Sequence, residues 1–254
     1  MDRMKKIKEI RTKLKSGDIS IGSWMQLHDP SVAELLGHAG YDWIAVDMEH
    51  GTYSHFELPN LFRALELGQT LPLVRLLEGN NNECKLALDA GAGGVIIPNV
   101  QCEKKLKKLI NASKWPPVGS RGVGFSRANL FGVNFEDYST EAKEPIVVAM
   151  IESKEAIDNL EPILKVDGLD AIFVGPYDLS ASLGCLGDFD DKKFRISIKK
   201  IKDLALKMNI PMGMHIVKPD TQLLEEKIKE GYQFIAYSID AVVLSEFIVN
   251  PFKK

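Results

Sequence analysis

The sequence has few cysteines, no long apolar run and no excess of positive charge. Its three cysteines, Cys84, Cys102 and Cys185, are widely spaced and form no CxxC pair. An odd number of isolated cysteines argues against a disulfide framework and favours reduced thiols, so we expect a cytoplasmic protein. No apolar run approaches the roughly 20 residues of a membrane span. No apolar segment follows the basic N-terminus, so we expect neither a secretory signal nor a membrane partner.

The charge balance also excludes a class of partner. The net charge is −3 and the calculated pI is about 6.0, whereas a nucleic-acid-binding protein needs a basic surface. Hydrophobic residues make up 45% of the chain and charged residues 26%, which is ordinary for a globular protein. A chain of 254 residues can bury a full core, as one large α/β domain or as two small ones.

Helical and strand patterns alternate along the whole chain. An amphipathic helix is predicted over residues 2–15, and eight apolar runs that read as strands follow it, each with a predicted helix behind it. Residues 115–138, rich in glycine, proline and aromatic residues, read as a long loop. The predicted strands span 19–27, 43–46, 71–77, 94–98, 146–151, 171–174, 211–217 and 234–237, and the helices 29–39, 56–67, 83–90, 102–113, 154–164, 189–208, 221–230 and 241–249.

This order predicts a single (β/α)8 TIM barrel over residues 1–254, with an extra N-terminal helix over residues 1–16. A doubly wound open sheet is the alternative, but its nucleotide-binding forms need a glycine-rich turn directly after a strand and before a helix. The glycines of residues 91–94 come after a helix and before a strand, and those of residues 119–124 lie in the long loop. Neither set supports a dinucleotide site.

Polar and charged residues follow most of the predicted strands. In a barrel the C-terminal ends of all strands meet at one mouth, so these side chains are expected to share one site. They are Gln26 or His28, then Asp47, Glu49 and His50, Arg75, Asn99, Glu152, Asp178, His215, Ser238 and Asp240.

Glu152 and Asp178 each follow a strongly apolar strand, and carboxylates on neighbouring strand ends suit a hard divalent cation such as Mg²⁺ or Mn²⁺. The alternative is that either carboxylate pairs with Arg75 or caps the next helix. Zinc is disfavoured, since no HExxH spacing or nearby cysteine is present.

Arg75 is a cation inside an apolar run. Its fork suits a substrate carboxylate or a developing oxyanion, and a structural ion pair is the competing interpretation. His50 is the best candidate base, because the pKa of histidine lies nearest neutrality. No predicted strand carries a lysine within its apolar run, so Schiff-base chemistry is disfavoured against metal-assisted chemistry.

Taken together, these residues resemble the HpcH/HpaI aldolases, a family that includes 4-hydroxy-2-oxoheptanedioate and 2-dehydro-3-deoxyglucarate aldolases. The likeness is collinear from about residue 14 to residue 247. It rests on the motifs Val-Asp47-Met-Glu49-His50-Gly, Leu-Val-Arg75, Leu-Asp89-Ala-Gly, Ile-Ile-Pro98, Trp-Pro-Pro-Val-Gly-Ser-Arg121-Gly-Val-Gly, Ile-Glu152-Ser and Val-Gly-Pro-Tyr-Asp178-Leu-Ser.

The resemblance implies a barrel of the phosphoenolpyruvate/pyruvate type and a class II, metal-dependent pyruvate aldolase. The substrate would be a 4-hydroxy-2-oxo acid, either a 2-dehydro-3-deoxy sugar acid or a hydroxy-oxo-diacid, cleaved reversibly to pyruvate and an aldehyde. The cation would be Mg²⁺ or Mn²⁺, with Co²⁺ as a further option. Members of the family are homo-oligomers, commonly hexamers, so we expect a homo-oligomer.

Carried over to this chain, the family's site assigns each residue a role. His50 is the base, Arg75 stabilises the enolate and Asp89 raises the basicity of His50. Glu152 and Asp178 are the metal ligands. Substrate contacts fall on Arg75, Tyr177, Asp178, Met150 and His215, and supporting roles on Asp47 and Glu49.

The chain departs from the family at three of these positions. Met150 stands where relatives usually have glutamine, His215 where they have an apolar residue lining the aldehyde pocket, and Tyr177 where they have a small residue. We therefore predict a different aldehyde, one that is more polar or charged.

Two other functions compete with the aldolase. A citrate lyase β-type enzyme acting on CoA esters would need an extended basic groove, and the sequence shows no clear one. A catalytically inactive barrel used as a binding module is expected to have lost some of His50, Arg75, Glu152 and Asp178, yet all four are present.

Overall fold

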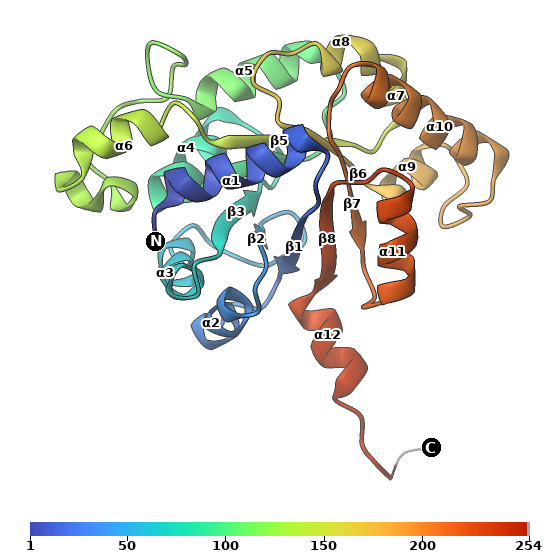
Figure 1. Ribbon diagram of the computed structural model, residues 1–254, viewed down its shortest axis with the longest axis horizontal. Coiled ribbons are helices and arrows are strands. Elements are labelled where there is room, and N and C mark those ends of the chain that lie inside the picture. The colour runs from blue at the N-terminus through green and yellow to red at the C-terminus, as the bar shows by residue number, and fades with distance from the viewer. Residues whose placement is uncertain (253–254) are drawn as a thin grey trace.

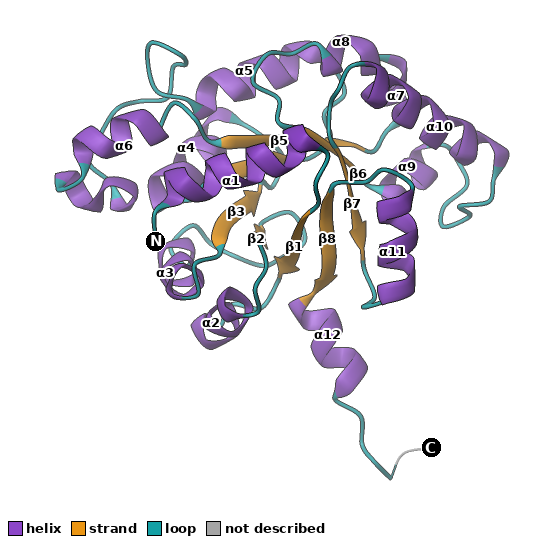
Figure 2. Cartoon of the chain, viewed as in Figure 1, coloured by secondary structure: helices purple, strands orange, loops and turns teal. Residues whose placement is uncertain are grey.

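The computed structural model describes residues 1–252, and these residues form a closed barrel of eight parallel strands with helices around it (Figure 1). Neighbouring strands follow each other in sequence order, and β8 closes the barrel against β1. Figure 2 shows the strands at the centre and the helices on the outside. The predicted (β/α)8 barrel is confirmed.

The strands end within two residues of the predicted positions, because strictly apolar runs bounded by polar residues mark buried strands well. They are β1 (Ser20–Met25), β2 (Trp43–Asp47), β3 (Leu71–Arg75), β4 (Gly94–Ile97), β5 (Ile146–Ile151), β6 (Ala171–Val174), β7 (Met212–Ile216) and β8 (Phe234–Ile239).

Several helices start where a side chain accepts one of their first N–H groups. Asp29 caps α2, ahead of Pro30 at the first helical position, and Asn80 caps α4. The helices are α1 (Arg3–Ser16), α2 (Pro30–His38), α3 (Leu58–Leu67), α4 (Asn81–Ala90), α5 (Glu103–Ser113), η1 (Arg127–Gly132), α6 (Phe135–Glu141), α7 (Lys154–Asp158), α8 (Leu160–Leu164), α9 (Pro176–Ser182), α10 (Lys192–Lys207), α11 (Thr221–Lys229) and α12 (Asp240–Phe247).

Two helical predictions were wrong in detail. The helix predicted over 189–208 begins at Lys192, because the Asp191 carboxylate accepts the N–H groups of Lys193 and Phe194 and so caps it. The helix predicted over 154–164 is two short helices that meet at Asn159. A continuous helix there would lose a hydrogen bond at Pro162, which has no N–H.

Helical turns also occur where none were predicted. The loop predicted over residues 115–138 contains η1 and the start of α6, and α9 follows β6 directly. These segments lack the apolar periodicity by which a helix is recognised in a sequence.

The inside of the barrel is filled by alternate residues of each strand. Trp43 stacks on Phe234, with 4.2 Å between ring centroids, and Phe173 packs edge-on against Phe234. A Cβ atom on Gly22 would lie 2.1 Å from the Trp43 ring, so only glycine fits there. Helix α1 closes the N-terminal end of the barrel with Ile7, Ile10 and Leu14. The opposite end stays open to solvent.

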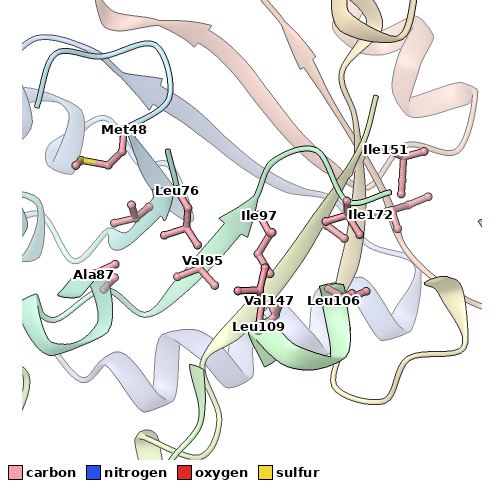
Figure 3. Close-up of a cluster of buried hydrophobic side chains, with 14 of the residues drawn as sticks. Met48, Leu76, Ala87, Val95, Ile97, Leu106, Leu109, Val147, Ile151 and Ile172 are labelled. Carbon is pink, nitrogen blue, oxygen red and sulfur yellow. The ribbon is translucent and has the colours of Figure 1, made fainter. Parts of the chain in front are cut away.

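A second apolar layer lies between the strands and the surrounding helices. Figure 3 shows part of it, where Val95 and Ile97 of β4 and Val147 of β5 face Leu106 and Leu109 of α5. Because strand residues alternate between the two layers, the residues that point inward are fixed by the pleat. This alternation decides which side chains reach the open mouth.

Helix α12 projects away from the barrel instead of packing along it (Figure 1). Several of its apolar side chains and of those just after it are exposed, including Leu244, Phe247, Ile248 and Phe252. In residues 1–252, no helix is long and apolar enough to cross a membrane.

Candidate active site

The inward-facing rows of the strands change from apolar to charged at the C-terminal mouth. Ala45 is followed by Asp47 on β2, Leu73 by Arg75 on β3, and Met150 by Glu152 just after β5. Asp47 and Arg75 are direct partners in the β2–β3 pairing. The pleat therefore brings the predicted charged residues together at one end, as the sequence predicted.

Arg75 and Asp47 form a buried bidentate ion pair. Arg75 Nε and Nη2 donate to the two Asp47 carboxylate oxygens at 2.7 and 2.6 Å. Arg75 Nη1 lies 2.9 Å from Glu49 Oε2, a close charge contact without hydrogen-bond geometry. The guanidinium also lies 4.5 Å from the centre of the Trp24 ring. The competing ion-pair interpretation of Arg75 is thus correct in the structure, and the pair fixes Arg75 at the mouth.

Asp47 is ionised because its partners outweigh its burial. Burial alone would raise its pKa, but hydrogen bonds from Arg75 and Gln26 hold the pKa of the Asp47 carboxyl below its ordinary value. The Asp47 carboxylate also accepts the backbone N–H groups of Glu49 and His50 at 3.1 and 3.3 Å. Asp47 therefore holds both Arg75 and the turn that carries His50.

His50 lies on the turn after β2 and lines the cavity at the mouth. Its ring has no hydrogen-bond partner in the part of the chain that the structure describes, although its backbone is tied to Asp47. The ring is exposed, so its nitrogens are accessible to a bound molecule. This position is compatible with the predicted role of a base.

Glu152 is buried directly after β5. Its Oε1 accepts the backbone N–H of Asn99, a residue held in the left-handed region at φ 50°. Burial is the main cause that raises the pKa of Glu152 to about 7; the nearby Glu49 and Asp178 carboxylates add to it, and the Asn99 hydrogen bond opposes it. Neither alternative for Glu152 is realised among residues 1–252: Ser153 caps α7, and Glu152 forms no ion pair with Arg75.

Asp178 lies in the first turn of α9 and lines the same cavity with Tyr177. It makes no capping hydrogen bond to α9. Tyr177 is about half exposed, and its ring packs edge-on against Phe189 with 5.2 Å between centroids. Both residues therefore present polar groups to the cavity.

Glu152 and Asp178 fit a divalent cation. Both offer only carboxylate oxygens, the ligands that hard divalent cations prefer. The pKa of Glu152 is raised mainly by burial and further by the neighbouring Glu49 and Asp178 carboxylates, and a bound cation would favour the ionised form. In the described residues, no group of three or more acidic, histidine or cysteine side chains has ligand spacing, so water or substrate oxygens would complete the shell.

The cavity at the mouth has a volume of about 190 Å³. A larger hollow of about 410 Å³ lies between α1 and the η1–α6 segment, where Arg3 pairs with Glu66 and Glu141. We assign the site to the smaller cavity because it brings together Arg75, His50 and Asp178 from the strand ends, with Glu152 against Gly175 of its wall. Its walls are Trp24, Gln26, His50, Arg75, Met150, Phe173, Gly175, Pro176, Tyr177, Asp178, His215, Val217 and Ile239.

All three residues that depart from the family pattern, Met150, Tyr177 and His215, are part of the wall. Met150 points inward and is buried. His215 Nε2 lies 3.2 Å from the Ser238 carbonyl oxygen, and the His215 ring packs 5.6 Å from the Trp24 ring. Burial lowers the pKa of His215 to about 4, so its ring is neutral.

Comparison with known proteins agrees with this geometry. The model of the HpcH/HpaI aldolase/citrate lyase family matches residues 20–246. The chain belongs to this family.

Its relatives in the HpcH/HpaI family include named aldolases. A 4-hydroxy-2-oxovalerate aldolase from Novosphingobium aromaticivorans is 32% identical, over 94% of this chain and 91% of that protein. A hydroxypyruvate/pyruvate aldolase from Roseobacter denitrificans is 32% identical over 91% of this chain and 90% of that protein. The crystal structure of a family protein from Burkholderia cenocepacia superposes with a TM-score of 0.87 at 30% identity, covering 94% of this chain and 95% of that one. Class II aldolases generally need a divalent metal ion.

Asp89, which the HpcH/HpaI resemblance couples to His50, lies elsewhere. It is near the C-terminal end of α4, and its carboxylate is 4.0 Å from Arg121 Nη1. In a barrel this end of a helix leads into the next strand and therefore lies at the closed face. Within one chain the structure does not bring Asp89 to His50.

Three contacts around the candidate site of this HpcH/HpaI barrel were missed by the sequence analysis. A Cβ atom on Gly175 would lie 2.6 Å from Glu152 Oε2, so glycine there makes room for the carboxylate. Lys105 Nζ donates to the carbonyls of Pro98 and Asn99 and so fixes the loop whose N–H reaches Glu152. Trp24 stacks on Arg75. Only Gly175 had a signal, since a glycine directly follows an apolar strand.

Proposed function

We propose that this chain is a class II aldolase that cleaves a 4-hydroxy-2-oxo acid reversibly to pyruvate and an aldehyde. The observation that carries the proposal is an anchored arginine at the same mouth as two carboxylates without an ion-pair partner within residues 1–252: Asp178 lines the cavity, and Glu152 lies against Gly175 of its wall. The names of the relatives support the reaction class. Mg²⁺ or Mn²⁺ is the proposed cation, with Co²⁺ as a further option, held by Glu152 and Asp178.

The cation would supply Lewis-acid polarisation of the 2-oxo group. Arg75, fixed by Asp47, places a permanent positive charge where the enolate oxygen of pyruvate forms. His50 takes the proton of the 4-hydroxyl group while the C3–C4 bond breaks and the aldehyde carbonyl forms. Met150, Trp24 and Phe173 form an apolar wall that limits water beside the reacting carbons.

A retro-aldol assay tests the proposal. We expect pyruvate release from at least one member of a panel of 4-hydroxy-2-oxo acids, spanning 2-dehydro-3-deoxy sugar acids and hydroxy-oxo-diacids. EDTA should abolish this release, and Mn²⁺ or Mg²⁺ should restore it. Activity that survives EDTA, together with a pyruvate adduct trapped by borohydride, would contradict the metal mechanism.

The CoA-ester lyase has less support from the site. Arg75 is the one lysine or arginine among the residues that line the cavity, and its guanidinium is already paired with Asp47 and Glu49. A CoA pyrophosphate would need further cations. CoA esters belong in the assay panel as the direct check, with no turnover expected.

A homo-oligomer, a hexamer by family resemblance, is part of the proposal. The apolar side chains exposed on and after α12, among them Leu244 and Phe247, support self-association. Light scattering of the full chain should give a mass several times 28.3 kDa. Replacing Leu244 and Phe247 together by glutamate should lower that mass. The three cysteines are free thiols, which supports the proposed cytoplasmic location.

A further inference from the structure

Strand β8, whose Ile239 lines the cavity, contains an irregularity beside it. Between β1 and β8, Gly22 pairs with Ala236 but Trp24 pairs with Ile239, so β8 has one extra residue there. Ser238, in this bulge, has its backbone in the left-handed region at φ 63°, a conformation that residues other than glycine rarely adopt. Bulges and strained backbone of this kind cluster at functional sites, where they redirect a group.

The redirected group is the Ser238 carbonyl. Its oxygen accepts hydrogen bonds from Ser23 Oγ at 3.1 Å and from His215 Nε2 at 3.2 Å. The Ser238 hydroxyl in turn donates to the Val217 carbonyl at 3.1 Å. Two strands therefore hold Ser238 in place, and Ser238 holds the ring of His215.

This contact fixes the tautomer of His215. A carbonyl oxygen can only accept, so Nε2 carries the proton and donates it to Ser238. Burial keeps the ring neutral at physiological pH. Nδ1 is then a lone-pair acceptor, and among the described residues no donor reaches it, nor is it sealed off from solvent. Because His215 lines the cavity, its free acceptor is available to a bound molecule.

The charged neighbours of His215 already have hydrogen-bond partners. Arg75 and Asp47 both influence the ring, but they are hydrogen-bonded to each other. The other residues of this wall are Trp24, Val217 and Ile239, with the Trp24 indole N–H buried away from solvent, and Gln26, whose amide donates to Asp47. An anionic group placed there would find no free cation and no free donor on His215.

We propose that His215 Nδ1 accepts a hydrogen bond from a hydroxyl group on the aldehyde half of the substrate, so that uncharged hydroxylated aldehydes are preferred to alkyl and carboxylated ones. The inference rests on the proposed aldolase function and selects, within it, the sugar-acid type of substrate over the diacid type.

Competition between matched aldehydes tests it. In the aldol direction, pyruvate would be offered with propanal, 2-hydroxypropanal, 3-hydroxypropanal and succinic semialdehyde, with Mn²⁺ present. We expect at least one hydroxypropanal to exceed propanal about tenfold in kcat/KM, the value of one hydrogen bond, with succinic semialdehyde below both. The ratio should fall to about one in His215→Leu and recover in part in His215→Asn, which keeps an acceptor.

Other outcomes overturn the proposal. The same ratio in wild type and His215→Leu would remove His215 from recognition. An equal loss with every aldehyde in His215→Leu would place His215 at the reacting oxygen or in the fold. A preference for succinic semialdehyde would show that the wall accepts an anion.

Two further measurements distinguish a failure of the His215 proposal from a failure of the aldolase proposal. Exchange of the pyruvate methyl protons in D₂O, with Mn²⁺ but no aldehyde, reports enolate formation alone. Exchange without a hydroxyl preference overturns the His215 proposal only, and the absence of both exchange and cleavage overturns the aldolase function with it. Nitrogen NMR of the wild-type protein at pH 7, assigned with His215→Leu, should show His215 protonated at Nε2 and bare at Nδ1; a proton on Nδ1 would contradict the proposal.

Discussion

The two halves of the site differ in how their charge is balanced. On β2 and β3, the cation of Arg75 is enclosed by Asp47 and Glu49, and the pair is buried and bidentate. After β5 and β6, Asp178 lines the cavity and Glu152 lies against Gly175 of its wall, and neither carboxylate has an ion-pair partner among residues 1–252. The chain itself completes the first half, whereas in our proposal a bound cation completes the second.

The largest effect on stability is expected when the balanced half, the Asp47–Arg75 ion pair, is broken. Arg75→Met leaves the Asp47 carboxylate buried without its partner, so the free energy of unfolding should fall by about 3–5 kcal/mol. Urea denaturation at pH 7 measures it. The double variant Asp47→Leu/Arg75→Met should recover much of the loss, because no charge is then left unpaired. A loss below about 1 kcal/mol in the single variant would mean that the pair is not buried in solution.

Removing charge from the unbalanced half should have the opposite effect on stability. Glu152→Gln removes a buried carboxylate that lies near two others, while its amide oxygen can still accept the Asn99 N–H. At pH 8 the metal-free variant should therefore be as stable as wild type or about 1–2 kcal/mol more stable. Its retro-aldol kcat/KM should fall at least about 10²-fold.

The matched control is Glu155→Gln, which changes an exposed carboxylate on the neighbouring helix α7. It should alter neither quantity. A Glu152→Gln protein that is both less stable and fully active would show that Glu152 has a structural partner and is not a metal ligand.

The pH dependence of stability tests whether the His215 ring is shielded from solvent. Burial lowers its pKa from 6.5 to about 4, so below pH 7 the unfolded chain takes up a proton that the folded chain refuses. The neutral histidine costs no stability at pH 8, and the free energy of unfolding then falls as the pH is lowered toward 4. Between pH 8 and pH 5, wild type should lose about 2 kcal/mol more unfolding free energy than His215→Leu does. Parallel pH profiles from chemical denaturation would show instead that the ring is solvated.

The smallest predicted effect concerns the room left for Glu152. In Gly175→Ala the new methyl group meets the Glu152 carboxylate and must displace it by a few tenths of an ångström or more. We expect Mn²⁺ affinity to fall about tenfold, the range seen when groups supporting a metal ligand change. Calorimetric titration measures this, with Gly124→Ala as control, since a Cβ atom there meets nothing within 4 Å. Equal affinities would mean that Glu152 is not a ligand.

The sequence predicted the fold and the location of the site from one physical regularity. Apolar runs that end in a charged residue gave the strands, and the pleat then placed Asp47, Arg75 and Glu152 on the inner face of the mouth. The proposed roles of these residues could also be argued from their residue types. To place His50 and Asp178 at the mouth, it was enough that each follows a predicted strand.

What the sequence could not supply depends on contacts between distant segments. The left-handed backbone of Asn99 and Ser238 and the bulge in β8 depend on neighbouring strands, and no local pattern encodes them. Likewise, the choice between ion pair and metal ligand for each carboxylate required the distances: Asp47 meets Arg75, and Glu152 does not. Asp89 had a motif but no place at the mouth of its own chain.

The central claim is that the unbalanced half binds a divalent cation that the reaction uses. Titration of Mn²⁺ into the metal-free protein, followed by electron paramagnetic resonance with and without pyruvate, measures this directly. We predict one Mn²⁺ per chain, tighter binding in the presence of pyruvate, and loss of that site in Glu152→Gln but not in Glu155→Gln. Absence of binding in the presence of pyruvate, or equal binding by Glu152→Gln, would contradict the account.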